Sequence, residues 1–205
     1  KVRGPLSLVG GDRAVTNIDH ERLAVESSSR IRRACCLPVN DNLFSTKIVL
    51  VQDPFKPAPE LEIDDFSLDE DLVRVVSKYL DDRRLIGSSI ELAAPKFVGV
   101  SPVVLLQARS GRSHAAIKYA CEEKLAEFLS PLNGGDGTGW PFGQSLGSGT
   151  VGHLISQIEG VEQVVDVSLF EADLRNKARA GVAADSIDLE SDALFLCFRP
   201  QVVIR

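Results

Sequence analysis

Apolar side chains recur at helical spacing in four stretches of the chain, and residues 67–84 show the pattern best. Five apolar side chains form one stripe in that stretch: Leu72, Val75, Val76, Tyr79 and Leu80. Ser67 and Glu70 have the spacing of a capping box, in which each side chain satisfies a backbone donor at the helix start. Similar patterns predict helices over 16–28, 113–129 and 150–158, the first of them beginning at Thr16.

Strands are predicted where β-branched and apolar residues run together without helical spacing. The predicted strands cover residues 31–37, 46–52, 89–93, 97–108, 161–170 and 192–204, with a turn at 38–42 between the first two. Residues 97–108 are apolar at nearly every position, which is typical of a central strand covered on both faces. Pro102 interrupts this run and favours a bulge or an edge segment. Residues 176–185 are polar and alanine-rich, and we expect a loop there.

The order of these elements predicts an α+β fold in two small lobes, each a mixed sheet with helices packed on one face. The first lobe spans residues 1–94 in the order α-β-β-α-β and includes a proline-rich, acidic connection at 53–66. Proline stiffens the backbone and removes hydrogen-bond donors, so we expect that connection to be extended. The second lobe spans residues 95–205 in the order β-α-glycine-rich loop-α-β-β.

The composition narrows the classes of partner. The 205 residues carry 23 Lys and Arg against 29 Asp and Glu, a net charge of −6, which argues against a dedicated nucleic-acid or anionic-membrane surface. No apolar run approaches the roughly 18–20 residues that cross a bilayer. The chain begins at Lys1 and contains no Met, so we expect it to be a piece of a longer chain. Its four cysteines show no C-x-x-C spacing and are expected to be free thiols in a reducing compartment.

The segment from Gly134 to Gly152 holds half of the 16 glycines and two motif-like spellings. Gly147–Gly152 spells G-x-G-x-x-G, and Gly143–Gly147 spells G-x-S-x-G around Ser145. Either spelling is consistent with an enzyme that handles a nucleotide or an acyl group through the Gly143–Gly152 loop. Both fingerprints must follow a buried strand directly, however, and the residues before them, Trp-Pro-Phe at 140–142, are poor strand material. We therefore assign no catalytic or cofactor-binding residue.

Histidines and aromatic rings are the other candidates for a site. The histidines His20, His114 and His153 lie on three predicted helices without a second ligand at i+3 or i+4, so no metal site is assigned. Two large rings lie beside glycines in the long loop, and such rings either pin a loop to the core or present an anchor to a partner. The sequence leaves both interpretations open. The candidate interface or loop-anchoring residues are Gly137, Gly139, Trp140, Pro141, Phe142 and Gly143.

Three stretches carry a family resemblance. Residues 11–19 read GDRAVTNID and are followed by RLA at 22–24, residues 79–87 read YLDDRRLIG, and residues 133–143 read NGGDGTGWPFG. Together with the turn at Gly160, and in this order and spacing over about residues 3–205, they resemble the C-terminal part of the baseplate J-like assembly proteins. Those proteins are baseplate wedge components of contractile phage tails and of extracellular contractile injection systems.

The resemblance implies a structural protein with no enzymatic activity and no cofactor. It would be the C-terminal portion of a longer wedge protein, assembled in the cytoplasm into a phage-tail-like particle as a homo- or hetero-oligomer. The implied partners are a related wedge subunit, the hub and spike, and sheath-proximal components, with no nucleic acid and no membrane. The alternatives are the enzyme that uses Gly143–Gly152 and a small-ligand sensor whose ligand would lie at the lobe junction.

Overall fold

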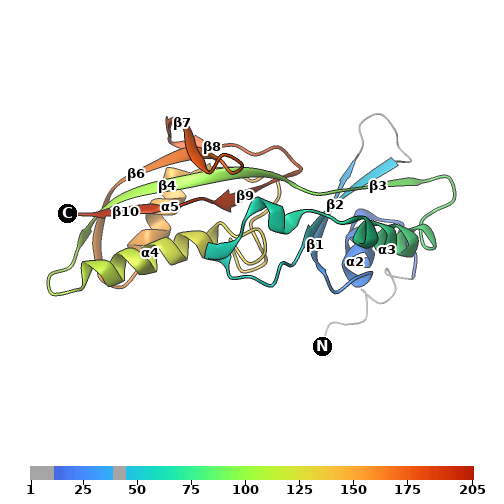
Figure 1. Cartoon of the computed structure of the whole chain (residues 1–205), viewed down its shortest axis with the longest axis horizontal. Helices are drawn as coiled ribbons and strands as arrows, with labels where there is room; N and C mark the ends of the chain where they lie inside the picture. The colour runs from blue at the N-terminus through green and yellow to red at the C-terminus, as the bar shows by residue number, and fades with distance from the viewer. Residues whose placement is uncertain (1–11, 39–44) are drawn as a thin grey trace. The chain divides into compact units, whose positions relative to one another are not determined.

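The computed structural model describes residues 12–38 and 45–205, and Figure 1 shows their helices and strands. Gly11 of the first motif and most of the turn expected at 38–42 lie outside the described residues. Within the described residues the chain forms four α-helices and three sheets, two of which mix parallel and antiparallel strands. The predicted α+β class is confirmed.

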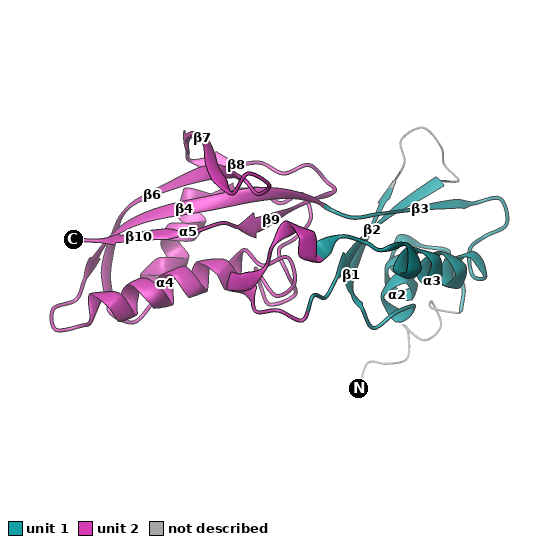
Figure 2. Cartoon of the chain, viewed as in Figure 1, with its two compact units in different colours: residues 1–54, 66–95 teal, residues 55–65, 96–205 magenta. Residues whose placement is uncertain are grey.

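The chain divides into two compact units, which Figure 2 shows in different colours. Unit 1 contains the chain up to Pro54 together with Phe66–Pro95, and unit 2 contains Phe55–Asp65 together with Lys96–Arg205. The connection was expected in the first lobe, but its central part, residues 55–65, belongs to unit 2. It forms the short 3₁₀ helix η1 (Ala58–Glu60), which packs on helix α4 (His114–Phe128), and the side chain of Leu61 after it is buried. A second 3₁₀ helix, η2 (Ile63–Phe66), follows, so the connection is not extended throughout.

Unit 1 is a three-stranded mixed sheet with two helices on one face. Strand β1 (Ile31–Pro38) is antiparallel to β2 (Ser45–Gln52), and β3 (Ser89–Ala93) is parallel to β2. Parallel neighbours need a crossover connection, and helix α3 (Glu70–Asp81) lies within it. Side chains from α3, from helix α2 (Asn17–Glu26) and from the sheet form one core: Ala14, Leu23, Ala24, Ile31, Ile48, Leu50, Leu72, Val76 and Leu80.

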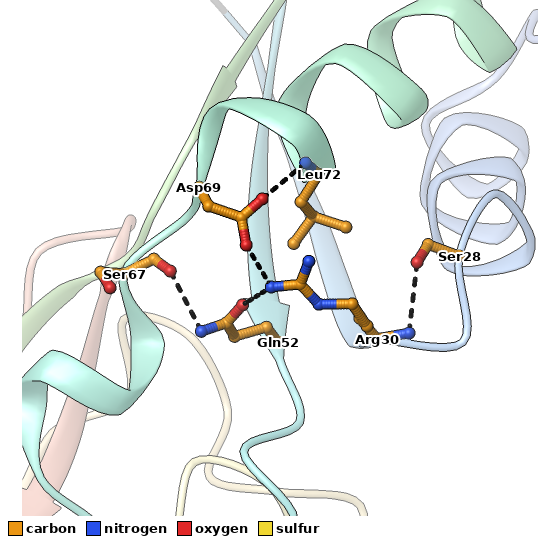
Figure 3. Close-up of polar contacts among 6 residues, drawn as sticks. All are labelled: Ser28, Arg30, Gln52, Ser67, Asp69 and Leu72. Carbon is orange, nitrogen blue, oxygen red and sulfur yellow. Dashed lines mark hydrogen bonds and ion pairs between the residues drawn. The ribbon is translucent and has the colours of Figure 1, made fainter.

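The two helices of unit 1 begin at different kinds of cap. Thr16 caps α2 through a capping box with Asp19, which confirms the predicted start. The box predicted for α3 from Ser67 and Glu70 is wrong, because Asp69 caps this helix by accepting a hydrogen bond from the Leu72 amide at 2.7 Å. Figure 3 shows that Asp69 also binds the Arg30 guanidinium.

Unit 2 contains a five-stranded mixed sheet with two helices packed on one face. Its strands are β4 (Lys96–Ala108), β6 (Val161–Asp173), β7 (Ala178–Ala184), β9 (Ala193–Cys197) and β10 (Gln201–Ile204). The helices are α4 (His114–Phe128) and α5 (Ser148–Ser156), and α5 begins two residues before the predicted start. β4 lies at the centre, with antiparallel β6 on one edge and parallel β9 and β10 on the other. The central position predicted for this strand is confirmed, whereas α4 and α5 cover only one of the two faces that were expected to be covered.

The single strand predicted at 192–204 is wrong, because it is broken between β9 and β10. On the edge of β4 that pairs with β9 and β10, the carbonyls of Val100 and Leu106 accept hydrogen bonds from the amides of Phe198 and Arg205. Pro102 is two residues after Val100 and four before Leu106, so its backbone nitrogen faces the same edge. This nitrogen carries no hydrogen and cannot donate a hydrogen bond there. The partner strand leaves the ladder at that point, after Cys197, and returns at Gln201. Pro102 thus stays inside β4 and interrupts its neighbour instead.

The loop predicted at 176–185 is also wrong, since these residues contain all of β7. Asp173 closes the turn from β6 by accepting hydrogen bonds from the amides of Arg175 and Asn176. β7 then pairs with β6 as an edge strand, and two further residues, β8 (Ser186–Ile187), pair with β5 (Leu146–Gly147). Nearly every side chain of β7 is exposed. Backbone hydrogen bonds to β6, rather than burial of side chains, therefore stabilise β7. Its alanines and glycine show no alternation of apolar and polar residues.

Candidate functional site

The glycine-rich loop between α4 and β5 folds back onto the end of α4. The amides of Gly134 and Trp140 both donate to the carbonyl of Ser130, at 2.9 and 3.0 Å, and the Gly135 amide donates to the carbonyl of Phe128 at 2.9 Å. A Cβ atom on Gly134 would lie 2.3 Å from the Phe128 carbonyl oxygen, so only glycine fits there without a shift. The loop is therefore a closed, internally bonded structure.

Trp140 pins this loop to the core of unit 2. Only 2% of its surface is exposed, and its ring meets those of Phe128 and Phe195 edge-on, with centroids 5.3 and 5.6 Å apart. Its indole Nε1 donates to the Gln144 carbonyl at 2.9 Å, which satisfies the one polar atom of the buried ring. Of the two interpretations that the sequence left open for Trp140, the structure therefore favours the pin.

The other candidate residues of the loop divide into an inner and an outer set. Gly139 is buried, and its amide donates to the Gly134 carbonyl at 3.1 Å, while Gly143 donates to the Ala193 carbonyl at 3.2 Å. Gly137 and Pro141 are exposed, and Phe142 is half-buried. The loop therefore offers solvent a rim made of residues 135–138 and Pro141, which the buried tryptophan holds from below.

The Gly143–Gly152 region does not have the geometry of either enzyme fingerprint. Within the described residues, the chain enters α5 from the two-residue strand β5, which pairs only with β8 and is no part of the five-stranded sheet. The first amide of the helix, at Ser148, donates to the Asp185 carbonyl at 2.8 Å. Ser145 is exposed, and no hydrogen bond joins it to a histidine in the part of the chain that the structure describes.

Histidines and carboxylates do not gather into a metal site. Among residues 12–38 and 45–205 there is no group of three or more ligating side chains that could hold an ion. His20 is buried with its Nδ1 2.8 Å from the Thr16 carbonyl oxygen, and His153 lies on α5 with its Nε2 3.0 Å from the side-chain Nε2 of Gln157. No described helix is long and apolar enough to cross a membrane.

The cysteines are free, as the sequence predicts, and their environment keeps them protonated. Burial raises the pKa of Cys36 and of Cys121 to about 11 and that of Cys197 to about 12. Burial also raises the pKa of Cys35. A catalytic cysteine needs the opposite shift, because the thiolate is the nucleophile. These thiols therefore have the character of packing residues.

Sequence reasoning missed an exposed aliphatic surface in unit 1. Two motifs that are far apart in the chain, around Ala14 and around Arg84, meet as an isolated parallel bridge, and Arg83 binds Asp12 at 2.7 Å. Four aliphatic side chains flank this junction, are between 44% and fully exposed, and are called the aliphatic patch below: Val15, Ile18, Leu85 and Ile86. Val15 precedes α2 and Leu85 and Ile86 follow α3, so no helical spacing in the sequence marks these residues as a surface.

Comparisons with known proteins match the fold. No protein-family model matches the sequence, and no curated protein matches it. Among the solved structures that match is a chain in the cryo-EM structure of the anti-feeding prophage (AFP) baseplate, 6-fold symmetrised, with a TM-score of 0.64 and 12% identity. The match covers 95% of this chain but 40% of that chain. The two proteins therefore share a fold over nearly all of this chain, which spans less than half the length of its neighbour.

Proposed function

We propose that the protein is a structural component of the baseplate of a contractile, phage-tail-like injection particle, and within it a wedge protein of the baseplate J-like kind. The observation that carries this proposal is the fold shared with a chain of the AFP baseplate over 95% of the present chain. The order of the three sequence motifs supports the wedge assignment. In this proposal the chain has no enzymatic role and uses no cofactor.

The protein acts by binding other proteins of the particle: a related wedge subunit, the hub and spike, and sheath-proximal components. It joins them in the cytoplasm, as part of a homo- or hetero-oligomer. Two features of the surface support contact with proteins rather than with a small molecule. One is the aliphatic patch of unit 1, and the other is the rigid rim of the glycine-rich loop in unit 2.

The aliphatic patch is the first contact surface that we propose. Contiguous exposed aliphatic side chains are characteristic of interaction sites, whereas single ones are ordinary. Ile86 is fully exposed, and burying an isoleucine side chain contributes about 1.5–3 kcal/mol. An apolar face of a neighbouring baseplate subunit would bury it.

The rim of the glycine-rich loop is the second contact surface that we propose. Gly139, Trp140 and Gly143 anchor the loop from within, and Gly137, Pro141 and Phe142 lie toward its surface. A loop that is already ordered loses little conformational entropy when a partner docks on it. We propose that this rim contacts another baseplate protein.

The assembly test compares two exposed aliphatic residues in the particle-forming source. Ile86→Asp places a negative charge in the proposed contact, and binding would then bury an unpaired carboxylate, which weakens the association. Val182→Asp is the matched control, because Val182 is 85% exposed on β7 and is not part of the aliphatic patch. We expect few or no sheathed particles with the first variant and normal numbers with the second, while the isolated chains melt at unchanged temperatures. Normal assembly with Ile86→Asp would refute the role of the aliphatic patch.

A further inference from the structure

Arg179 lies on the face of the five-stranded sheet that α4 and α5 do not cover. Val100 and Val104 of β4 point into the core beneath these helices, and Ser101, next to Val100, points to the opposite face. Arg179, on β7, donates from Nε and Nη2 to the hydroxyl of Ser101 at 3.1 and 3.0 Å. The guanidinium is therefore placed on the open face of the sheet.

This guanidinium is held in position more firmly than exposed arginines usually are. Its central carbon lies 4.8 Å from the centre of the Phe170 ring, at cation–π distance. Ser101 is completely buried and donates its own hydrogen to the Arg199 carbonyl at 3.2 Å, so its oxygen is left to accept from Arg179. The break in the strand opposite Pro102 provides that carbonyl. The position of Arg179 thus follows from the architecture of the sheet.

One edge of the guanidinium has no partner. The Nε–Nη2 edge faces Ser101, whereas within the described residues no hydrogen bond or ion pair involves Nη1. Arg179 is exposed, so this Nη1–Nη2 edge is open to another molecule. Six other arginines each form an ion pair with a carboxylate of this chain: Arg22, Arg30, Arg74, Arg83, Arg84 and Arg112.

The charges around Arg179 favour an anion that comes from outside the chain. Arg199, whose carbonyl accepts from Ser101, is also exposed and stacks over Phe198 at 5.2 Å. Among the described residues, no carboxylate lies within ion-pair distance of either arginine. The guanidinium beside the buried Ser101 hydroxyl therefore remains without a counter-charge among the described residues, although the whole chain carries a net charge of −6.

We infer that Arg179 is a recognition site for a carboxylate side chain of a neighbouring protein. A planar guanidinium edge matches a carboxylate in a two-point hydrogen bond, which lysine cannot form. A nucleic-acid backbone is disfavoured, because stable binding takes many phosphate contacts and the net charge opposes it. The identity of the partner as another baseplate protein rests on the proposed function, but the chemistry of the site does not.

The test is an NMR titration of the isotope-labelled 205-residue chain at low salt. The probes are a capped tetraglutamate peptide and, as its neutral match, a capped tetraglutamine peptide. The signal is the Nε–H resonance of Arg179, assigned from its disappearance in Arg179→Lys. We expect a saturable shift with tetraglutamate, none with tetraglutamine, and at least a tenfold weaker affinity in Arg179→Lys, followed through the Ser101 and Phe170 amides. Arg32→Lys, which changes an exposed arginine of unit 1, should bind like the parent.

Several results would overturn the inference. They are the absence of a shift, an equal affinity in Arg179→Lys, and an equal response to tetraglutamine. A tighter response to inorganic phosphate than to tetraglutamate would overturn the assignment to a carboxylate. Matching melting temperatures of parent and variant exclude unfolding as the cause of a loss. The titration uses no particle, so its failure would leave the baseplate proposal standing, and failed particle assembly would leave the titration unchanged.

Discussion

The amide nitrogen of Ala14 donates a hydrogen bond to the carbonyl oxygen of Arg83 at 3.0 Å, which joins the chain before α2 to the chain after α3. This one contact brings together the two segments that carry the aliphatic patch. Arg83 strengthens the junction in two ways, by its ion pair with Asp12 and by stacking at 3.7 Å over the Tyr79 ring. The proposed contact surface therefore depends on the integrity of this junction.

Replacing Arg83 by alanine should loosen the junction. The change removes the ion pair with Asp12, the stacking on Tyr79 and a hydrogen bond to the Tyr79 carbonyl at 3.0 Å. We expect the melting temperature to fall by roughly 1–5 °C and the Ala14 amide to exchange faster with solvent. The control is Arg74→Ala, since among the described residues Arg74 pairs with Asp71 alone and both side chains are more than three-quarters exposed. Equal effects of the two variants would contradict the role given to Arg83.

Acid should destabilise unit 1 through its helix caps. Hydrogen bonds from the Thr16 amide and hydroxyl lower the pKa of Asp19, and the bonds from Arg30 and from the Leu72 amide lower the pKa of Asp69. A lowered pKa means that the ionised form stabilises the folded state, so this stability is present above the unfolded value of about 3.9 and is lost as the pH falls through the lowered value.

The measurement is the melting temperature between pH 6 and pH 2. We expect a decline that begins near pH 4 and is shallower in Asp69→Asn, which has no carboxylate to protonate. That variant should also melt roughly 2–4 °C lower than the parent at pH 6, because it loses its ion pair with Arg30. A variant with the same pH profile as the parent would show that Asp69 does not contribute.

Trp140 is the only tryptophan of the chain, so its fluorescence reports on the glycine-rich loop. Because the ring is buried, we expect a blue-shifted emission and weak quenching by iodide in the native protein. Trp140→Ala should cost about 3–5 kcal/mol in urea unfolding, as other large-to-small changes in a core do. Trp140→Phe should cost less, since it keeps most of the ring contacts and loses the bond to Gln144. An emission spectrum typical of a solvent-exposed tryptophan in the folded parent would contradict the assignment of Trp140 as a buried anchor of the loop.

Two glycine-to-alanine changes in the same glycine-rich region should have opposite signs. Gly134→Ala places a Cβ 2.3 Å from the Phe128 carbonyl oxygen and 2.5 Å from that of Ser130, so we expect a loss of about 1–3 kcal/mol. Gly149 lies in α5, and beyond its chain neighbours and the helix's own backbone no described atom lies within 4 Å of the point that a Cβ would occupy, so Gly149→Ala should stabilise the protein by roughly 0.5–1 kcal/mol. Urea denaturation of both variants measures the difference, and a tolerated alanine at 134 would show that the loop is not closed there.

The sequence predicts elements whose side chains enter a core and fails where the backbone alone decides. The stripe from Leu72 to Leu80 identifies α3 because Leu72, Val76 and Leu80 are buried in the core, although Val75 of the same stripe is 48% exposed. β7 was missed because its exposed alanines leave no periodic trace. The break between β9 and β10 was missed because its cause, Pro102, lies in the neighbouring strand and acts through the missing hydrogen bond.

The candidate site was predicted only in part, for a similar reason. The glycines and rings of the loop stand out in the sequence, but whether Trp140 points inward depends on Phe128 and Phe195, which no local pattern connects to it. The bridge beside the aliphatic patch joins Ala14 to Arg84, 70 positions apart, and the bond that sets Arg179 joins it to Ser101, 78 positions apart, so only the folded chain brings these residues together.

The most direct test of the baseplate assignment is a cryo-EM map of the intact contractile particle from the source, purified with this protein carrying an affinity tag. We predict that the particles co-purify with the tag and that the map contains symmetry-related copies of this fold within the baseplate, each with the aliphatic patch against a neighbouring subunit. A complete baseplate map in which every subunit is traced and none has this fold would contradict it.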